Sequence, residues 1–332
     1  MLPLSRTLPI PIALAFLAPS ELGFRPAKGS TWTKTFTRSS EMHLEEFLVE
    51  MQGAPVPSQY LPEMEITITD AFELIVVDRY HELAAGRPRR LSRKYVEIAT
   101  SATSTSEVAM AGMTPETEDL EAEGTSGLAG REVEFVWDEA RGEYEARWAG
   151  NEGGGDELLA ELGEDLDLRA LLPGGEVAQG DSWTVPAETF AEVLYPGGEL
   201  GIELEGDPID HLDPDYEELT FSGEATLRLG KIEEGVAAIE IEGEIEHRGE
   251  MEGDLSHVPV VDGAATQVDT VRYALEGVLE WDVAAGMARS LAVEARVTVA
   301  SVTSKDEDDP QYEHRLVFRG RTSFAMRCRA GE

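Results

Sequence analysis

The stretch that decides the fold runs Leu219-Thr220-Phe221-Ser222-Gly223-Glu224-Ala225-Thr226-Leu227-Arg228-Leu229. Apolar residues, glycine or alanine occupy every second position, and the residues between them are polar or charged. Side chains of a β-strand point alternately to opposite faces, so a period of two is typical of a strand with one buried and one solvated face. This stretch therefore predicts a strand at the boundary between a core and water.

The same alternation recurs along most of the chain. It is clear at 239–246, 273–281, 291–299 and 316–327, and less regular at 32–37, 41–51, 64–77, 89–100, 132–137 and 143–148. Parallel pairing would need helical crossovers between these strands, and the sequence does not contain them. We therefore predict a mainly β fold of long antiparallel meander strands. Glycines on the apolar faces, such as Gly277 and Gly320, favour curved sheets or open barrels.

The chain divides into two similarly built β halves joined by short helices. We assign residues 1–29 to a signal peptide and tail, 30–150 to an N-terminal β half, 151–200 to a helical connector and 201–332 to a C-terminal β half. The pattern Trp-Asp-x-Ala-x-Gly occurs at 137–142 and again at 281–286, each time between two alternating stretches, which favours related halves.

Periodicity also indicates the remaining segments. Leucines at helical spacing after the glycines of 153–155 predict a helix over 156–172, and a second helix is predicted over 187–194. Segments 114–126, 206–215 and 306–310 are rich in acidic residues, proline or glycine, and we expect them to be flexible loops.

The N-terminus indicates export. Arg6 precedes an apolar run from Leu8 to Ala18, and Ala18-Pro19-Ser20 supplies small residues for cleavage. A cleaved signal peptide would place the protein in the periplasm or outside the cell; the alternative is an uncleaved tail. No later segment has the roughly 20 apolar residues of a spanning helix, so we expect no integral membrane segment in the mature chain.

Charge excludes several classes of partner. The chain has 66 acidic against 27 basic residues, a formal net charge of -39, which repels nucleic acid and anionic membrane surfaces. Because the acids are spread along the chain, a solvated surface is the simplest interpretation, and cation binding is the alternative.

The one cysteine excludes an intramolecular disulfide. Cys328 lies between Arg327 and Arg329, whose charges would lower its pKa. We interpret it as a spare thiol on a fraying last strand.

One motif resembles a known family. Leu171-Leu172-Pro173 is followed by Val177-x-x-Gly180-Asp181-x-Trp183, where Pro173 ends a helix, Gly180 and Asp181 form a tight turn, and Trp183 begins a strand and enters the core. With Gly130-x-x-Val133 and Gly277-x-x-x-Trp281-Asp282, it resembles an uncharacterised family of secreted or lipid-anchored bacterial β-rich proteins. The resemblance implies a β fold and an envelope location, and it implies no activity. The cysteine that accepts a lipid in anchored members is missing here.

Motifs for catalysis are missing. No Gly-x-Ser-x-Gly occurs, His81-Glu82 is followed by Ala85 where a zinc protease needs its second histidine, and the glycines of 153–155 lead into acids that would repel a phosphate. We therefore expect no enzyme and no cofactor. Paired carboxylates are too numerous for their spacing to locate or exclude a hydrolase site.

The most specific hypothesis for an ion-binding site is a calcium-binding loop. Asp207, Asp210, Asp213 and Asp215 occur in one proline-bearing segment and offer the oxygen ligands that calcium prefers. A plain solvated loop is the alternative, as it is for the acids at 306–309.

The sequence thus favours an exported, non-enzymatic structural or binding protein of the bacterial cell envelope. The first alternative is a carrier of an apolar ligand such as a lipid, held in a groove of the curved sheet. The candidate groove residues are Phe221, Leu227, Ile241, Leu279 and Phe318, and the competing interpretation is that they fill a solid core. An unrecognised hydrolase is the second alternative. An envelope protein is a further possible partner.

Overall fold

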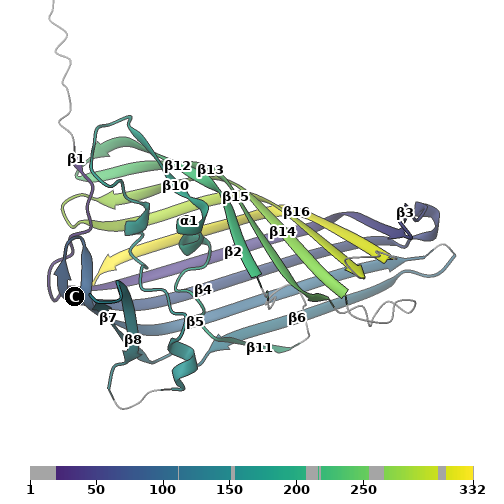
Figure 1. Ribbon diagram of the computed structural model, residues 1–332, viewed down its shortest axis with the longest axis horizontal. Helices are drawn as coiled ribbons and strands as arrows, with labels where there is room; N and C mark the ends of the chain where they lie inside the picture. The colour runs from purple at the N-terminus through teal and green to yellow at the C-terminus, as the bar shows by residue number, and fades with distance from the viewer. Residues whose placement is uncertain are drawn as a thin grey trace, which may run out of the picture.

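The computed structural model describes residues 20–110, 112–150, 154–206, 216, 218–253, 265–305 and 312–331. One large antiparallel sheet dominates it, and long strands wrap around a central connector (Figure 1). Among the described residues, fourteen strands form this sheet in the order β10-β12-β13-β14-β15-β16-β2-β4-β5-β6-β11, with β3, β7 and β8 attached beside that path. The sheet curves without closing, because β10 and β11 remain at its two ends. The predicted mainly β, antiparallel meander fold is confirmed.

The elements of the first half of the chain are mostly strands of the large sheet. They are β1 (Ser20–Glu21), β2 (Thr31–Met51), β3 (Ala54–Pro55), η1 (Ser58–Tyr60), β4 (Glu63–Ala84), β5 (Arg87–Ala109), β6 (Glu116–Ser126), β7 (Glu132–Asp138) and β8 (Glu143–Trp148). The connector contains η2 (Asp156–Leu159), η3 (Arg169–Leu171), β9 (Glu176–Val177), β10 (Ser182–Pro186) and α1 (Ala187–Leu194). The second half contributes β11 (Ile202–Gly206), β12 (Glu218–Glu233), β13 (Val236–Gly253), β14 (Ala265–Asp282), β15 (Met287–Lys305) and β16 (Tyr312–Ala330).

Strands of both halves belong to one sheet because the last long strand pairs with the first. β16 runs antiparallel to β2 from Tyr312 opposite Met51 to Ala330 opposite Trp32. This pairing joins residues almost 300 positions apart and brings the concave faces of the two halves together.

The helix predicted over 187–194 is confirmed as α1, which packs against β12 and β10. The helix predicted over 156–172 is wrong, since only the short 3-10 turns η2 and η3 form there. Leu168 even has a left-handed backbone, with φ of 58°. Tertiary contacts of Glu164, Asp167 and the buried leucines override the local helical spacing.

The loop predicted over 114–126 is also wrong, because Glu116–Ser126 is strand β6 and pairs with β5. Its buried positions are Ala122, Gly124 and Ser126, while the exposed Glu123 and Thr125 lie between them. The period of two is present in the sequence, but small inward side chains make it weakly hydrophobic.

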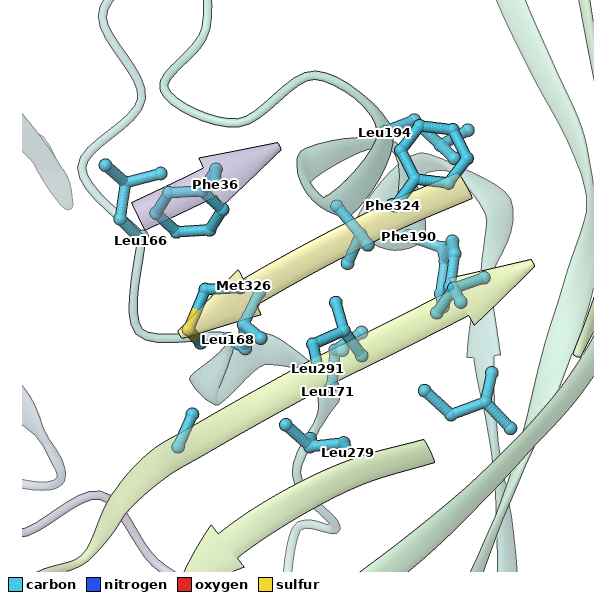
Figure 2. Packing of buried hydrophobic residues seen from close by; sticks show 14 of the residues in the cluster. Phe36, Leu166, Leu168, Leu171, Phe190, Leu194, Leu279, Leu291, Phe324 and Met326 are labelled. Carbon is cyan, nitrogen blue, oxygen red and sulfur yellow. The ribbon is translucent and has the colours of Figure 1, made fainter. Parts of the chain in front are cut away.

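The core lies between the connector and the concave face of the sheet (Figure 2). Leucines of the connector and residues of α1 pack onto the inward side chains of the strands. They include Leu166, Leu168, Leu171, Phe190 and Leu194 against Phe36, Leu279, Leu291, Phe324 and Met326, all at most 5% exposed. Burial of each such side chain contributes about 1.5–3 kcal/mol, so the connector is an integral part of the fold.

The repeated Trp-Asp-x-Ala-x-Gly pattern forms the same turn twice. Asp138 Oδ1 accepts hydrogen bonds from the backbone N–H groups of Ala140 and Arg141, and Gly142 N donates to Asp138 O at 2.8 Å. Asp282 and Gly286 repeat this arrangement, and both glycines have a positive φ. The pattern therefore encodes a hairpin turn in each half.

The motif at 171–183 folds back on itself. The indole N–H of Trp183 donates to the carbonyl of Leu171 at 2.9 Å, and the Asp181 carboxylate accepts from Ala178 N at 2.8 Å. Trp183 is the second residue of the short strand β10, which pairs with β12, so a strand starts within one residue of the predicted position. The motif thus has a structural role, fixing where the connector joins the sheet.

None of the described helices has both the length and the apolar composition needed to cross a membrane.

Candidate functional site

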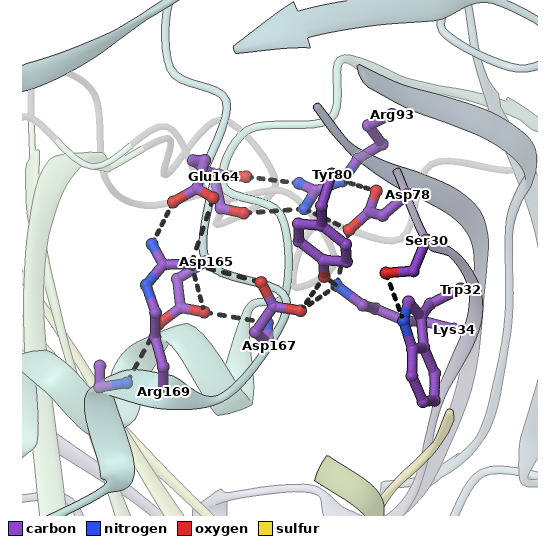
Figure 3. Close-up of polar contacts among 12 residues, drawn as sticks. Ser30, Trp32, Lys34, Asp78, Tyr80, Arg93, Glu164, Asp165, Asp167 and Arg169 are labelled. Carbon is purple, nitrogen blue, oxygen red and sulfur yellow. Dashed lines mark hydrogen bonds and ion pairs between the residues drawn. The ribbon is translucent and has the colours of Figure 1, made fainter. Parts of the chain in front are cut away.

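A cluster of buried charges fastens the connector to the sheet (Figure 3). Lys34 on β2 donates to Asp78 Oδ2 at 2.6 Å and to Asp167 Oδ1 at 2.5 Å. The Arg93 guanidinium binds both Asp78 oxygens, at 2.8 and 3.0 Å, and also donates to the carbonyl oxygens of Gly163 and Glu164. We call the set Lys34, Asp78, Tyr80, Arg93, Glu164, Asp167 and Arg169 the ionic network.

The centre of the ionic network is sealed from solvent, whereas the side chain of Arg169 at its edge is 15% exposed. Lys34, Asp78 and Arg93 are 0% exposed, and Asp167 is 1% exposed. Although burial opposes ionisation, the neighbouring Arg93 and Lys34 charges hold the pKa of Asp78 below its usual range. No substrate can reach these groups without unfolding the connector. The ionic network is therefore a structural contact. The connector supplies the Asp167 carboxylate to Lys34 and the backbone carbonyls of Gly163 and Glu164 to Arg93, while the Glu164 carboxylate pairs with Arg169 of the connector itself.

Cys328 lies next to the ionic network. It is 8% exposed and sits opposite Lys34 in the β16–β2 pair. The prediction of a fraying thiol with a lowered pKa is wrong, because burial raises the pKa of Cys328 to about 12. The flanking arginines point to the other face of the strand and leave the thiol in the core.

A cavity of about 820 Å³ lies further along the same concave face. Residues 194–202, from the end of α1 onward, form one wall, and Tyr216 with residues of β2, β4, β12, β13, β14, β15 and β16 forms the rest. Its apolar lining includes Met42, Ile68, Val271, Val297, Val299 and Phe318. We call it the concave cavity. Its volume is in the range of small-molecule sites.

One side of the concave cavity is aromatic and polar. The ring of His247 on β13 stacks on Tyr195, with centroids 6.1 Å apart, and meets Tyr273 edge-on at 5.9 Å. The Tyr195 hydroxyl lies 3.4 Å from His247 Nδ1 and also hydrogen-bonds to the Tyr273 hydroxyl. His247 is 6% exposed, and its Nε2 has no hydrogen-bond partner among the described residues. Burial lowers the pKa of His247 to about 4, so the imidazole is neutral near pH 7.

The concave cavity also contains a buried carboxylate. Asp269 on β14 is 7% exposed and accepts hydrogen bonds from Tyr216 Oη at 2.9 Å and from Gln267 Nε2 at 3.2 Å. Among the described residues it forms no ion pair. The one arginine of the lining, Arg38, is paired with Asp70 at 3.1 Å.

The five groove residues of the sequence-based hypothesis occupy different surroundings. Phe318 lines the concave cavity, and the Phe221 ring lies 5.8 Å from that of His247. Leu227, Ile241 and Leu279 are at most 1% exposed and pack in the core. The structure thus contains both a filled core and a cavity, at different positions along the same strands.

The acids of the calcium hypothesis, Asp207, Asp210, Asp213 and Asp215, lie outside the described residues, as do the acids at 306–309. Within the described ranges, no three His, Cys, Asp or Glu side chains are placed to hold a metal ion.

Sequence reasoning missed the ionic network and the polar side of the concave cavity, although the alternation of apolar and polar residues contains a signal for both. Lys34, Asp78 and Arg93 each occupy a position on the apolar face of an alternating stretch, and so do His247 and Asp269. A charged residue at such a position must find a partner or a cavity. The sequence alone does not tell which of the two it finds.

Two other hollows, of about 1370 and 930 Å³, lie on the outer face of the sheet. Charged residues of that face line much of each of them, for example Arg228 and Glu240 in the first and Arg296 and Arg321 in the second. We assign no site to them because they lack a buried polar group that needs a partner.

No protein-family model matches the chain, and no curated protein matches it. Among solved structures, an outer-membrane channel from Pseudomonas putida F1 is similar at 10% identity, with 94% of this chain and 100% of that chain covered and a TM-score of 0.17. A FadL homologue from Pseudomonas aeruginosa is similar at 8% identity, with 90% of each chain covered and a TM-score of 0.15. TM-scores this low carry no argument about fold or function.

Proposed function

We propose that this chain is an exported, non-enzymatic binding protein of the bacterial cell envelope that holds a small apolar ligand in the concave cavity. The observation that carries the proposal is the cavity itself, about 820 Å³ in volume and enclosed between a curved sheet and residues 194–202. Aliphatic and aromatic side chains together supply most of its lining, and polar groups converge on one side, as in typical ligand sites.

Two observations support carriage rather than catalysis. The central charges of the ionic network, Lys34, Asp78, Arg93 and Asp167, are closed to solvent. Around the concave cavity, the hydroxyls that contact His247 and Asp269 are the phenols of Tyr195 and Tyr216, and among the described residues no serine or threonine hydroxyl is hydrogen-bonded to either group. Hydrolysis of any ester, glycoside or peptide in a substrate panel, if a single substitution in the cavity abolished it, would contradict this part of the proposal.

Ligand uptake can be tested with N-phenyl-1-naphthylamine, an uncharged dye that fluoresces in apolar surroundings. We expect the purified protein to bind it, and Val297→Trp to weaken binding by about tenfold or more because the larger ring fills the cavity. Thr298→Trp is the matched control, since position 298 lies on the opposite face of the same strand. Circular dichroism verifies that both variants are folded.

The proposal is wrong if the natural-sequence protein binds no dye and carries no co-purified ligand in native mass spectrometry. Equal binding by Val297→Trp and Thr298→Trp would also contradict it, because the dye would then occupy another surface.

Export and family membership are proposed on the sequence. Arg6 with the apolar run Leu8 to Ala18 supports export, and the motif from Leu171 to Trp183 supports membership of the secreted β-rich family that it resembles. Mass spectrometry of the protein recovered from a bacterial host should find an N-terminus close to Ser20. A full-length cytoplasmic product would contradict export.

A further inference from the structure

Asp269 is an unusual group to find in a ligand cavity. It is 7% exposed, and its hydrogen-bond partners, Tyr216 and Gln267, are both neutral. A buried carboxylate is costly unless a positive charge lies close to it. Among the described residues, Asp269 forms no ion pair.

The other charged and polar groups of the concave cavity do not favour an anion. Arg38 is already paired with Asp70, so its positive charge is compensated. His247 carries no charge near pH 7, and its unpartnered Nε2 offers one more hydrogen-bonding position. An anionic head group such as a carboxylate would meet the Asp269 charge without gaining an unpaired cation.

Aromatic rings surround the same region. Tyr195, Tyr216, Tyr273 and Phe324 line the concave cavity, and Tyr273 and Phe324 lie edge to face with centroids 6.5 Å apart. The faces of aromatic rings attract cations, and the attraction grows where water is excluded. A net charge of -39 also raises the local concentration of cations around the whole protein.

We infer that the ligand of the concave cavity is a protonated amine on an apolar body, with Asp269 as its counter-ion and the tyrosines as its aromatic enclosure. The inference rests on the proposed function, since it assigns a chemical class to the same ligand. The apolar body would lie along Val297, Val299 and Phe318, and the ammonium group would lie between Asp269 and the rings of Tyr216 and Tyr273.

The test uses three probes that share a ten-carbon chain: decylamine, decanol and decanoate. Each is titrated separately into the purified protein in a calorimeter at pH 7, below its critical micelle concentration. We expect decylamine to bind at least about tenfold more tightly than either of the others. Asp269→Asn keeps the size of the side chain and removes its charge, and it should abolish the preference for decylamine while leaving decanol binding within about twofold.

A matched control separates this site from the general acidity of the protein. Glu276→Gln removes the same charge from the same strand, but at an exposed position on the outer face. It should leave the preference for decylamine unchanged. The inference is overturned if decanoate or decanol binds as tightly as decylamine, or if Asp269→Asn and Glu276→Gln have the same effect. If none of the three probes binds while N-phenyl-1-naphthylamine does, the inference fails and the proposed function stands; if the dye does not bind either and no ligand co-purifies, both fail.

Discussion

His247 is the residue whose behaviour depends most directly on its surroundings. Tyr195 and Tyr273 contact its ring, Asp269 is the charged group that acts on it, and burial is the main reason that its pKa falls to about 4 from 6.5. Desolvation disfavours the imidazolium, whereas the Asp269 charge favours it and offsets only part of that effect.

A pH dependence of stability follows. Between pH 6.5 and 4 the unfolded chain binds a proton at His247 and the folded chain does not, so the folded state loses stability as the pH falls through this window. Relative to His247→Gln, the natural protein should lose about 2–3 kcal/mol of unfolding free energy between pH 7.5 and 4.5. Urea denaturation of both proteins at the two pH values measures the difference. Parallel pH profiles would show that the folded protein accepts the proton freely.

At the scale of the element, neighbouring long strands lie so close together that some positions have room only for glycine. A Cβ atom at Gly277 on β14 would lie 2.5 Å from the carbonyl oxygen of Ala292 and 2.8 Å from Val293 Cγ2 on β15. At Gly320 on β16, a Cβ atom would overlap the carbonyl oxygen of Glu41 on β2. The glycines that the sequence places on apolar faces are thus sites where the coiled sheet leaves no room for a side chain.

Gly277→Ala should therefore destabilise the protein by about 1–3 kcal/mol, because one methyl group forces β14 and β15 apart. Gly174→Ala is the control, since nothing lies within 4 Å of its added Cβ. Thermal unfolding followed by circular dichroism compares the two variants. A Gly277→Ala protein as stable as the control would mean that the sheet relaxes without cost.

At the scale of the whole molecule, the ionic network joins segments that are distant in sequence. Lys34, Asp78 and Arg93 come from three neighbouring strands, and Asp167 comes from the connector. Replacing one buried partner leaves the others desolvated and unpaired, which is more damaging than the net strength of the original pair.

Lys34→Met should lower the unfolding free energy by about 3–5 kcal/mol, because Asp78 and Asp167 lose a shared cation. The control is Lys231→Met, which removes an exposed lysine 3.9 Å from Glu233 and should cost less than about 1 kcal/mol. Chemical denaturation gives both values. An equal, small effect of the two substitutions would contradict the structural role of the ionic network.

The strands were largely predictable because alternation is a local property of the chain. In stretches such as 219–229 and 291–299 the alternation itself shows which residues are buried. The turns at 137–142 and 281–286 contain the Asp and Gly that form them. Strand β6 escaped prediction because its inward residues are alanine, glycine and serine, which have little hydrophobicity to reveal the period.

The sequence by itself determined the mainly β class, the antiparallel meander and the strongly acidic surface, since each depends on neighbouring residues or on composition. Only the tertiary structure decided that β16 pairs with β2, that the connector lies on the concave face, and that His247 and Asp269 border a cavity while Leu279 lies in the core. The physical reason is that an alternating strand specifies which of its faces is dry, but the side chains that cover this face come from distant segments.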